Sequence, residues 1–162
     1  DLLYMQQLSS MNTVAIVKDE DGIYQRCQFS MIRNSTSGSY EGHLDQKEEL
    51  KGNAAMIEDA EYTVIDKLNG FLYFSVGNKL YTYRKGIDEC VEVNVPDVSF
   101  DAIVSLNVVT SGDYSSNIFV ATYSEANGGK VYRLTPESTD SRNLTVEEVI
   151  DTEGAVKCIT YW

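Results

Sequence analysis

A cluster of carboxylate side chains before Gly22 is spaced so that it could bind a cation. Asp19, Glu20 and Asp21 precede Gly22, an order similar to the start of a calcium-binding loop. A complete EF-hand loop needs alternating oxygen ligands and a glutamate at its twelfth position. The twelfth position counted from Asp19 is Ser30, so the pattern fails. An Asp-Gly hairpin turn explains the same residues, and we assign no metal ligand here.

His43 is the single histidine, so a serine or cysteine nucleophile activated by histidine would have to use it. It lies in the segment Tyr40–Asp45, which we expect to form a loop or a strand edge. The chain contains neither a Gly-x-Ser-x-Gly motif nor a distinctive cysteine context. We therefore assign no catalytic and no cofactor-binding residue from the sequence.

Pairs of acidic residues recur along the chain and could serve glycoside hydrolysis, which needs two carboxylates converging across a site. The pairs are Asp19/Asp21, Glu48/Glu49, Glu58/Asp59, Asp88/Glu89 and Glu147/Glu148. Adjacent acids on a strand point to opposite faces, and most of these pairs flank turns. We interpret them as a solvated surface.

Aromatic residues are the remaining candidates for ligand contact. The chain has 11 tyrosines, and these residues and Trp162 could stack on sugar rings. The competing interpretation, which we prefer, is that the tyrosines fill the packing between sheets with their hydroxyls at the rim. The triplets that begin at Asn34 and Asn143 match the glycosylation pattern, but such triplets often arise by chance.

The three cysteines, Cys27, Cys90 and Cys158, are too far apart for a Cys-x-x-Cys redox or zinc motif. Each lies in a strand-like apolar context, so we expect three buried free thiols. One disulfide with one remaining thiol is the alternative. The cysteines leave the cellular compartment open.

Net charge excludes two classes of partner. The chain has 162 residues, and its 25 acidic and 13 basic residues give a net charge of -12. A nucleic-acid backbone attracts clustered Lys and Arg, which the sequence lacks, and an anionic membrane surface is disfavoured for the same reason. No apolar run approaches the roughly 18 residues of a membrane helix.

Paired strand patterns joined by turns dominate the sequence and predict an all-β protein. Expected hairpins turn at Asp21-Gly22, at Gly77-Asn78 and across Ser124–Gly129. Each return strand begins with an aliphatic residue followed by tyrosine, and this pattern recurs about every fifty residues. That period fits the blades of a β-propeller, although a generic antiparallel meander gives similar patterns.

Flanking segments complete each repeat. We expect first strands at Ala55–Ile57, Ala102–Leu106 and Ala155–Trp162, and last strands at Cys90–Val95 and Val146–Ile150. Polar loops are expected at Arg33–Tyr40 and Thr139–Asn143, and a short helical turn at Asp45–Gly52. The blades then span residues 2–50, 53–97 and 100–154, with a final strand at 155–162.

Closure of such a ring needs four or more blades, so we predict a partial propeller of antiparallel four-stranded blades. An open stack would expose sheet faces and strand edges. We therefore expect N-terminal blades before Asp1, or a partner chain that covers the open faces. Packing of the same strands as a sandwich is the alternative.

Segments of the second half resemble a known family. Tyr73–Tyr83, Phe119–Tyr123, Gly129–Leu134 and Gly154–Trp162 resemble the C-terminal region of PKD-like family lipoproteins of Bacteroidetes. The resemblance covers about residues 60–162 and rests on blade motifs. It implies a propeller-like domain at the cell envelope, on the outer-membrane surface or in the periplasm, and a lipid anchor that lies outside this chain.

Together these features favour a non-enzymatic binding or scaffold module of the bacterial envelope, with a glycan or a protein as its ligand. The alternative is a propeller enzyme that acts on carbohydrate, a hydrolase or a lyase, with part of its site upstream. Convergent carboxylates around a channel would favour the enzyme.

Overall fold

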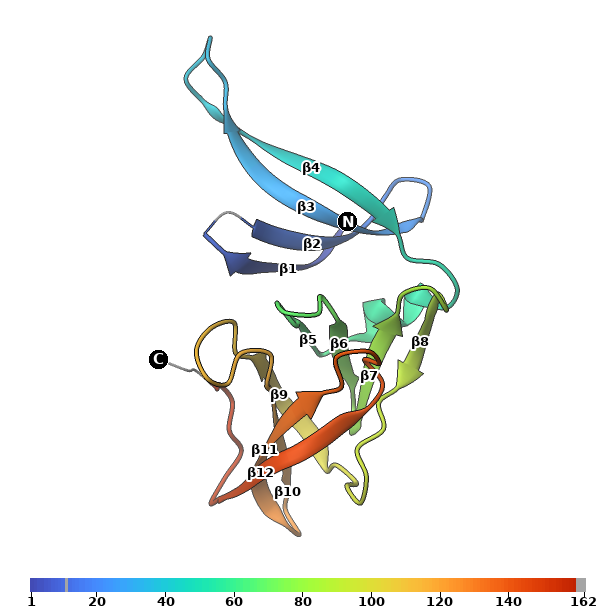
Figure 1. Cartoon of the computed structure of the whole chain (residues 1–162), viewed down its shortest axis with the longest axis vertical. Helices are drawn as coiled ribbons and strands as arrows, with labels where there is room; N and C mark the ends of the chain where they lie inside the picture. Colours follow the sequence, from blue (N-terminus) through green and yellow to red (C-terminus); the bar gives the residue numbers. More distant parts are fainter. Residues whose placement is uncertain (11, 160–162) are drawn as a thin grey trace. The chain divides into compact units, whose positions relative to one another are not determined.

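β-Strands make up nearly all the regular structure of the computed structural model, which describes residues 1–10 and 12–159 (Figure 1). The elements of this part are β1 (Leu2–Ser9), β2 (Asn12–Lys18), β3 (Tyr24–Arg33), β4 (Tyr40–Glu49), the 3-10 helix η1 (Ala54–Asp59), β5 (Tyr62–Ile65), β6 (Leu72–Val76), β7 (Lys79–Arg84), β8 (Glu89–Glu92), β9 (Ala102–Val108), β10 (Ile118–Ser124), β11 (Gly128–Pro136) and β12 (Leu144–Thr152). No helix in these residues is long and apolar enough to cross a membrane.

Three four-stranded antiparallel sheets result, in the orders β1-β2-β3-β4, β5-β6-β7-β8 and β9-β10-β11-β12. Each is a meander in which neighbours in sequence are neighbours in the sheet. This confirms the expected all-β class with four-stranded antiparallel sheets, and none of the described strands closes a sheet into a ring. The chain divides into two compact units, Asp1–Glu58 and Asp59–Trp162, which hold one sheet and two sheets respectively.

The hairpin turns lie where the sequence predicts them. β2 and β3 are joined through Asp21-Gly22, where the Gly22 amide donates to the Asp19 carbonyl and Gly22 has φ of 80°. β6 and β7 are joined at Gly77-Asn78, and Gly77 likewise has a positive φ of 62°. Glycine adopts this left-handed conformation without steric cost, which is why it marks these turns.

The expected helical turn at Asp45–Gly52 is wrong, because β4 continues to Glu49. Cross-strand pairing with β3 overrides the local helix preference of this charged segment. The ladder shifts register between Arg26 and Gln28, and Gln46 on the opposite strand has a φ of 49°. This irregularity accommodates one extra β4 residue, as a β-bulge does.

The expected first strand at Ala55–Ile57 is also wrong, because this segment is part of η1. The Met56 amide donates to the Asn53 carbonyl, and Ala54 and Ile57, three residues apart, are both buried. This spacing is that of a 3-10 helix, in which residues three apart share a face. The first strand of the second sheet is β5 instead, at Tyr62–Ile65.

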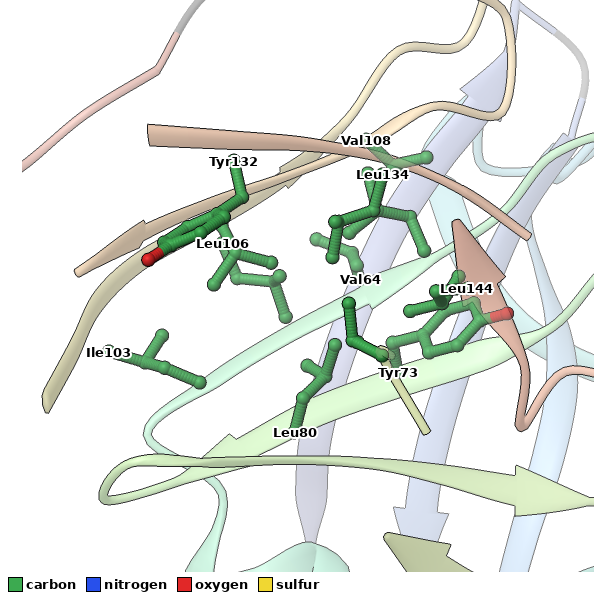
Figure 2. Packing of buried hydrophobic residues seen from close by; sticks show 12 residues of the cluster. Val64, Tyr73, Leu80, Ile103, Leu106, Val108, Tyr132, Leu134 and Leu144 are labelled. Carbon is green, nitrogen blue, oxygen red and sulfur yellow. The ribbon is translucent and has the colours of Figure 1, made fainter. Parts of the chain in front are cut away.

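The two sheets of the second unit pack on each other through one apolar core (Figure 2). The β5–β8 sheet contributes Val64, Tyr73 and Leu80, and the other sheet contributes residues such as Leu106 and Leu134. The two first strands, β5 and β9, lie in contact. The unit is therefore two stacked four-stranded sheets, held close at their first strands.

The last part of the chain departs from expectation. Residues 155–159 form no strand, and residues 160–162 of the expected final strand lie outside the described residues. Cys27 and Cys90 are buried free thiols, as predicted, but Cys158 is exposed. The prediction that Cys158 is buried is wrong, because this residue lies in the irregular C-terminal segment and not in a sheet.

Candidate functional site

A pocket of about 170 Å³ opens in the second unit at the end of its sheets where β6 turns into β7. Its apolar lining residues are Leu80 of β7 and four residues of the segment that connects β8 to β9, namely Val93, Val95, Val98 and Phe100. Leu80 and Val95 also belong to the core between the sheets. The pocket is thus a surface extension of that core.

Polar side chains form the rim of the pocket. Lys79 and Glu92 make an ion pair with Nζ and Oε2 2.7 Å apart, and both side chains are about half exposed. The hydrogen bond to Glu92, together with its charge, raises the pKa of Lys79 above its usual value. An exposed pair of this kind adds little to stability, so both groups remain available to a ligand.

Hydrogen bonds fix the turn against the connecting segment. Ile103 donates its amide to the Gly77 carbonyl at 3.0 Å, and Asn78 Nδ2 donates to the Phe100 carbonyl at 3.5 Å. The Phe100 ring packs edge-on against Tyr132, with centroids 5.2 Å apart. The pocket therefore rests on ordered backbone at the junction of the two sheets.

The β10–β11 turn also lies at this end of the unit. Asn127 Nδ2 donates to both carboxylate oxygens of Asp101, at 3.3 and 3.1 Å. Asn127 belongs to the β10–β11 turn, and Asp101 directly precedes β9. Turn residues of both sheets thus converge beside the pocket.

The size and the lining of the pocket limit what it can hold. Pockets that enclose whole cofactors or drug-sized molecules measure about 300–1,000 Å³, which is larger than this one. The apolar lining residues can contact one small group of a ligand, while the Lys79 ammonium, the Glu92 carboxylate and Ser99 can bond its polar edge. A side chain or one end of a longer ligand fits these dimensions.

Asp19, the start of the rejected calcium pattern, is a turn residue. Its Oδ1 accepts the amides of Asp21 and Ile23 at 3.0 and 2.8 Å, and its Oδ2 accepts Gln25 Nε2 at 2.8 Å. Both carboxylate oxygens are thus engaged by the hairpin that the sequence predicts. Among the described residues, no group of three His, Cys, Asp or Glu side chains is placed to hold a metal ion.

The other polar candidates do not converge on the pocket. His43 lies on β4 opposite Ser30, in the first unit. Glu48 and Glu49 follow it on β4, opposite Arg26 and Gln25 respectively. Because consecutive strand residues point to opposite faces, this acidic pair diverges, as the sequence indicates.

The tyrosines divide between packing and exposure. Tyr73 and Tyr132 are buried in the core between the sheets, which confirms the packing interpretation for these two. Desolvation raises the pKa of Tyr73 well above its usual value. Tyr40 is 64% exposed, and Arg133 lies over the Tyr114 ring at 4.8 Å. Trp162 lies outside the described residues.

No motif in the sequence indicates this pocket. The sequence predicts the Gly77-Asn78 turn, but most of the apolar lining comes from the β8–β9 connection, which carries no chemical motif. The apolar spacing of Val93, Val95 and Val98 was the one available signal, and it reads equally well as part of a last strand. Comparison with protein-family models, with curated proteins and with solved structures finds no significant match.

Proposed function

We propose that this chain is part of a β-propeller and acts as a non-enzymatic binding or scaffold module, with a glycan or a protein as the captured ligand. The observation that carries the proposal is the pocket at the turn end of two stacked four-stranded sheets. Propeller blades are four-stranded meanders that stack around an axis, and the turns that join their strands lie at the two ends of the stack. A rigid, small, mixed apolar and polar pocket among such turns suits capture better than enclosure of a cofactor.

The assignment of the sheets as blades has independent support in the distribution of charge. The first strands β1, β5 and β9 contain no charged residue, whereas β4, β8 and β12 contain at least two acidic residues each. Charged edges prevent unwanted strand pairing where an edge faces solvent. Uncharged first strands suit an axis at which sheets approach each other, as β5 and β9 do.

An envelope location, through a lipid anchor outside this chain, is part of the proposal and rests on the resemblance to PKD-like lipoproteins. Fractionation of the source cells with an antibody against the chain tests it. Recovery with the outer membrane or the periplasm is expected, and recovery with the cytosol would exclude it.

A binding screen with a blocked variant tests capture directly. We would print polysaccharide fragments and envelope peptides on an array and probe them with the chain and with Ser99→Trp. Ser99 is an exposed rim residue, so the indole should fill the pocket mouth without entering the core. Ligands of this pocket should lose at least about tenfold in affinity, a difference of roughly 1.4 kcal/mol.

Ser35→Trp is the matched control, because Ser35 is an exposed loop residue of the first unit. Retained binding by Ser35→Trp, with loss by Ser99→Trp, supports the pocket. Reducing-end detection on the bound glycans separates capture from turnover. Release of new reducing ends would contradict the non-enzymatic proposal, and equal binding by both variants would exclude this pocket as the site.

A further inference from the structure

A hydrogen-bond donor and an acceptor lie side by side at the rim of the pocket. Lys79 Nζ and Glu92 Oε2 are 2.7 Å apart, and both side chains are about half exposed. Two adjacent hydroxyl oxygens of a sugar ring are separated by about one hydrogen-bond length when the hydroxyls are gauche. A hydroxyl both donates and accepts, so one ring hydroxyl can accept from the Lys79 ammonium while its neighbour donates to the Glu92 carboxylate. Both bonds then have a charged partner, which strengthens them.

The apolar lining suits the carbon face of such a ring. Leu80 and Val95 are buried, whereas Val93, Val98 and Phe100 are only partly buried. All five residues line the pocket. A sugar ring carries hydroxyls at its edge and C–H groups on its face, and binding sites combine an apolar lining with a few polar groups that fix the orientation of the ligand. The volume of about 170 Å³ lies below the range for drug-sized ligands, which favours a single ring.

The backbone beside the pocket is already hydrogen-bonded within the chain. Val93 donates its amide to the Leu80 carbonyl at 2.8 Å. Just beyond the end of β8, Asn94 donates to the Arg142 carbonyl at 2.7 Å and accepts from the Leu144 amide at 3.0 Å. Recognition of a peptide by strand addition relies on open main-chain groups at a sheet edge. Because these groups are taken here, the pocket offers a ligand its side chains, which favours a glycan over an extended peptide.

Charge favours a neutral ligand. The charged residues that line the pocket are Lys79 and Glu92, and their charges cancel. The connection between β8 and β9 adds Asp97 and Asp101, and the whole chain has a net charge of -12. An acidic sugar or a phosphorylated ligand would be repelled by this field.

We propose that the ligand captured at this pocket is a neutral glycan, and that two adjacent hydroxyls of one sugar ring bridge Lys79 and Glu92. The face of the ring then lies against the apolar lining, and the rest of the glycan extends into solvent, because the pocket opens at the surface. The inference rests on the proposed capture function and names the class of its ligand.

Periodate treatment of the ligand tests the role of the hydroxyl pair, because periodate cleaves the carbon–carbon bond between two adjacent free hydroxyls. Amylose, mannan, xylan and galactan would be printed before and after oxidation, with the resulting aldehydes reduced by borohydride so that they cannot react with lysine. At least one native polysaccharide should bind, and oxidation should lower its affinity at least about tenfold. Curdlan is the matched control, since its linkage leaves no two adjacent free hydroxyls on its internal rings, and it should bind weakly in both forms.

Two ion pairs of the second unit provide matched variants. Lys79→Ala and Glu92→Ala should each lower the affinity for that polysaccharide at least about tenfold, because each removes one of the two bonds to the ring. Lys130 and Asp151 form the control pair, with Nζ and Oδ1 3.4 Å apart, and do not line the pocket. Lys130→Ala and Asp151→Ala should bind as the native chain does. Ion pairs near the surface add little to stability, and circular dichroism of each variant checks that the fold is retained.

The outcomes separate this inference from the proposed function. Equal binding before and after oxidation, full binding by Lys79→Ala, or no binding to any neutral polysaccharide would overturn the inference. Stronger binding to polygalacturonate than to the neutral polysaccharides would overturn it too. Binding of peptides alone, abolished by Ser99→Trp, would reject the glycan and leave capture at this pocket standing. Ligands that bind the native chain and Ser99→Trp equally would reject capture at this pocket itself.

Discussion

Single buried residues show how strongly the sheets of the second unit exclude water. Cys90 on β8 is 4% exposed, and burial together with the nearby Glu89 carboxylate raises the pKa of its thiol to about 11. Burial disfavours the charged thiolate, and the Glu89 carboxylate repels it. The thiol is therefore held neutral, and its role is packing and not chemistry, because the thiolate is the reactive form.

Replacement of Cys90 should change how stability depends on pH. The unfolded thiol ionises near 9.0, whereas the folded thiol ionises near 11, so unfolding releases a proton between these values. The free energy of unfolding should therefore fall by roughly 2 kcal/mol as pH rises from about 9 to 11. Cys90→Ala should remove this contribution, as measured by urea unfolding at a series of pH values.

Cys158→Ala provides the control for that series, because Cys158 is exposed. Its unfolding free energy should follow the native chain over the whole pH range. If the native chain and Cys90→Ala lose stability in parallel above pH 9, the thiol of Cys90 is not held neutral by the fold.

At the scale of elements, Gly129 of β11 explains how the C-terminal segment reaches the sheet. This glycine is buried and faces the chain that follows β12. A β-carbon there would overlap Thr152 Oγ1 and the Gly154 carbonyl oxygen. The absence of a side chain is therefore what lets the segment lie against β9–β12, where its far end meets Asn107.

Gly129→Ala should accordingly loosen the C-terminal segment. We expect the free energy of unfolding to fall by about 1–3 kcal/mol, the usual cost of an overpacked site. Faster amide hydrogen exchange at residues 154–159 should accompany the loss. Gly154→Ala is the matched control, since nothing lies within 4 Å of a β-carbon there, and it should stay within about 0.5 kcal/mol of the native chain. Equal effects of the two substitutions would mean that the segment does not contact Gly129.

Elements that depend on local turn chemistry could be predicted from the sequence. Gly22 and Gly77 occupy positive-φ turn positions, and glycine is the residue that reveals such positions. Elements that depend on tertiary pairing could not. The charged β4 segment resembles a helical turn until its pairing with β3 is known, and η1 resembles a strand because its four apolar residues are contiguous.

The candidate pocket was beyond prediction for a similar reason. Lys79 and Glu92 lie on neighbouring strands, and only the register brings their side chains together. Phe100 reaches the same place through an irregular connection whose path no periodicity encodes. The sequence therefore predicts the turn beside the pocket but not the residues of the β8–β9 connection that line it.

At the scale of the whole molecule, the three sheets repeat one plan. Each of the three sheets is a meander whose first strand is uncharged and whose last strand is acidic. In the second unit, the first strand of one sheet, β9, lies against β5 and β6 of the other sheet. In a propeller, the first strands of stacked blades gather at an axis and the last strands lie at the circumference.

Distances between spin labels test this arrangement most directly. One sample would carry labels on the first strands, at Gln6→Cys and Val104→Cys, and the other on the last strands, at Asp45→Cys and Glu147→Cys. Cys158 would be replaced by Ser in both, because it is the exposed native thiol. Pulsed electron paramagnetic resonance should give a clearly shorter distance for the first-strand pair than for the last-strand pair. An equal or longer distance for the first-strand pair would contradict the propeller account.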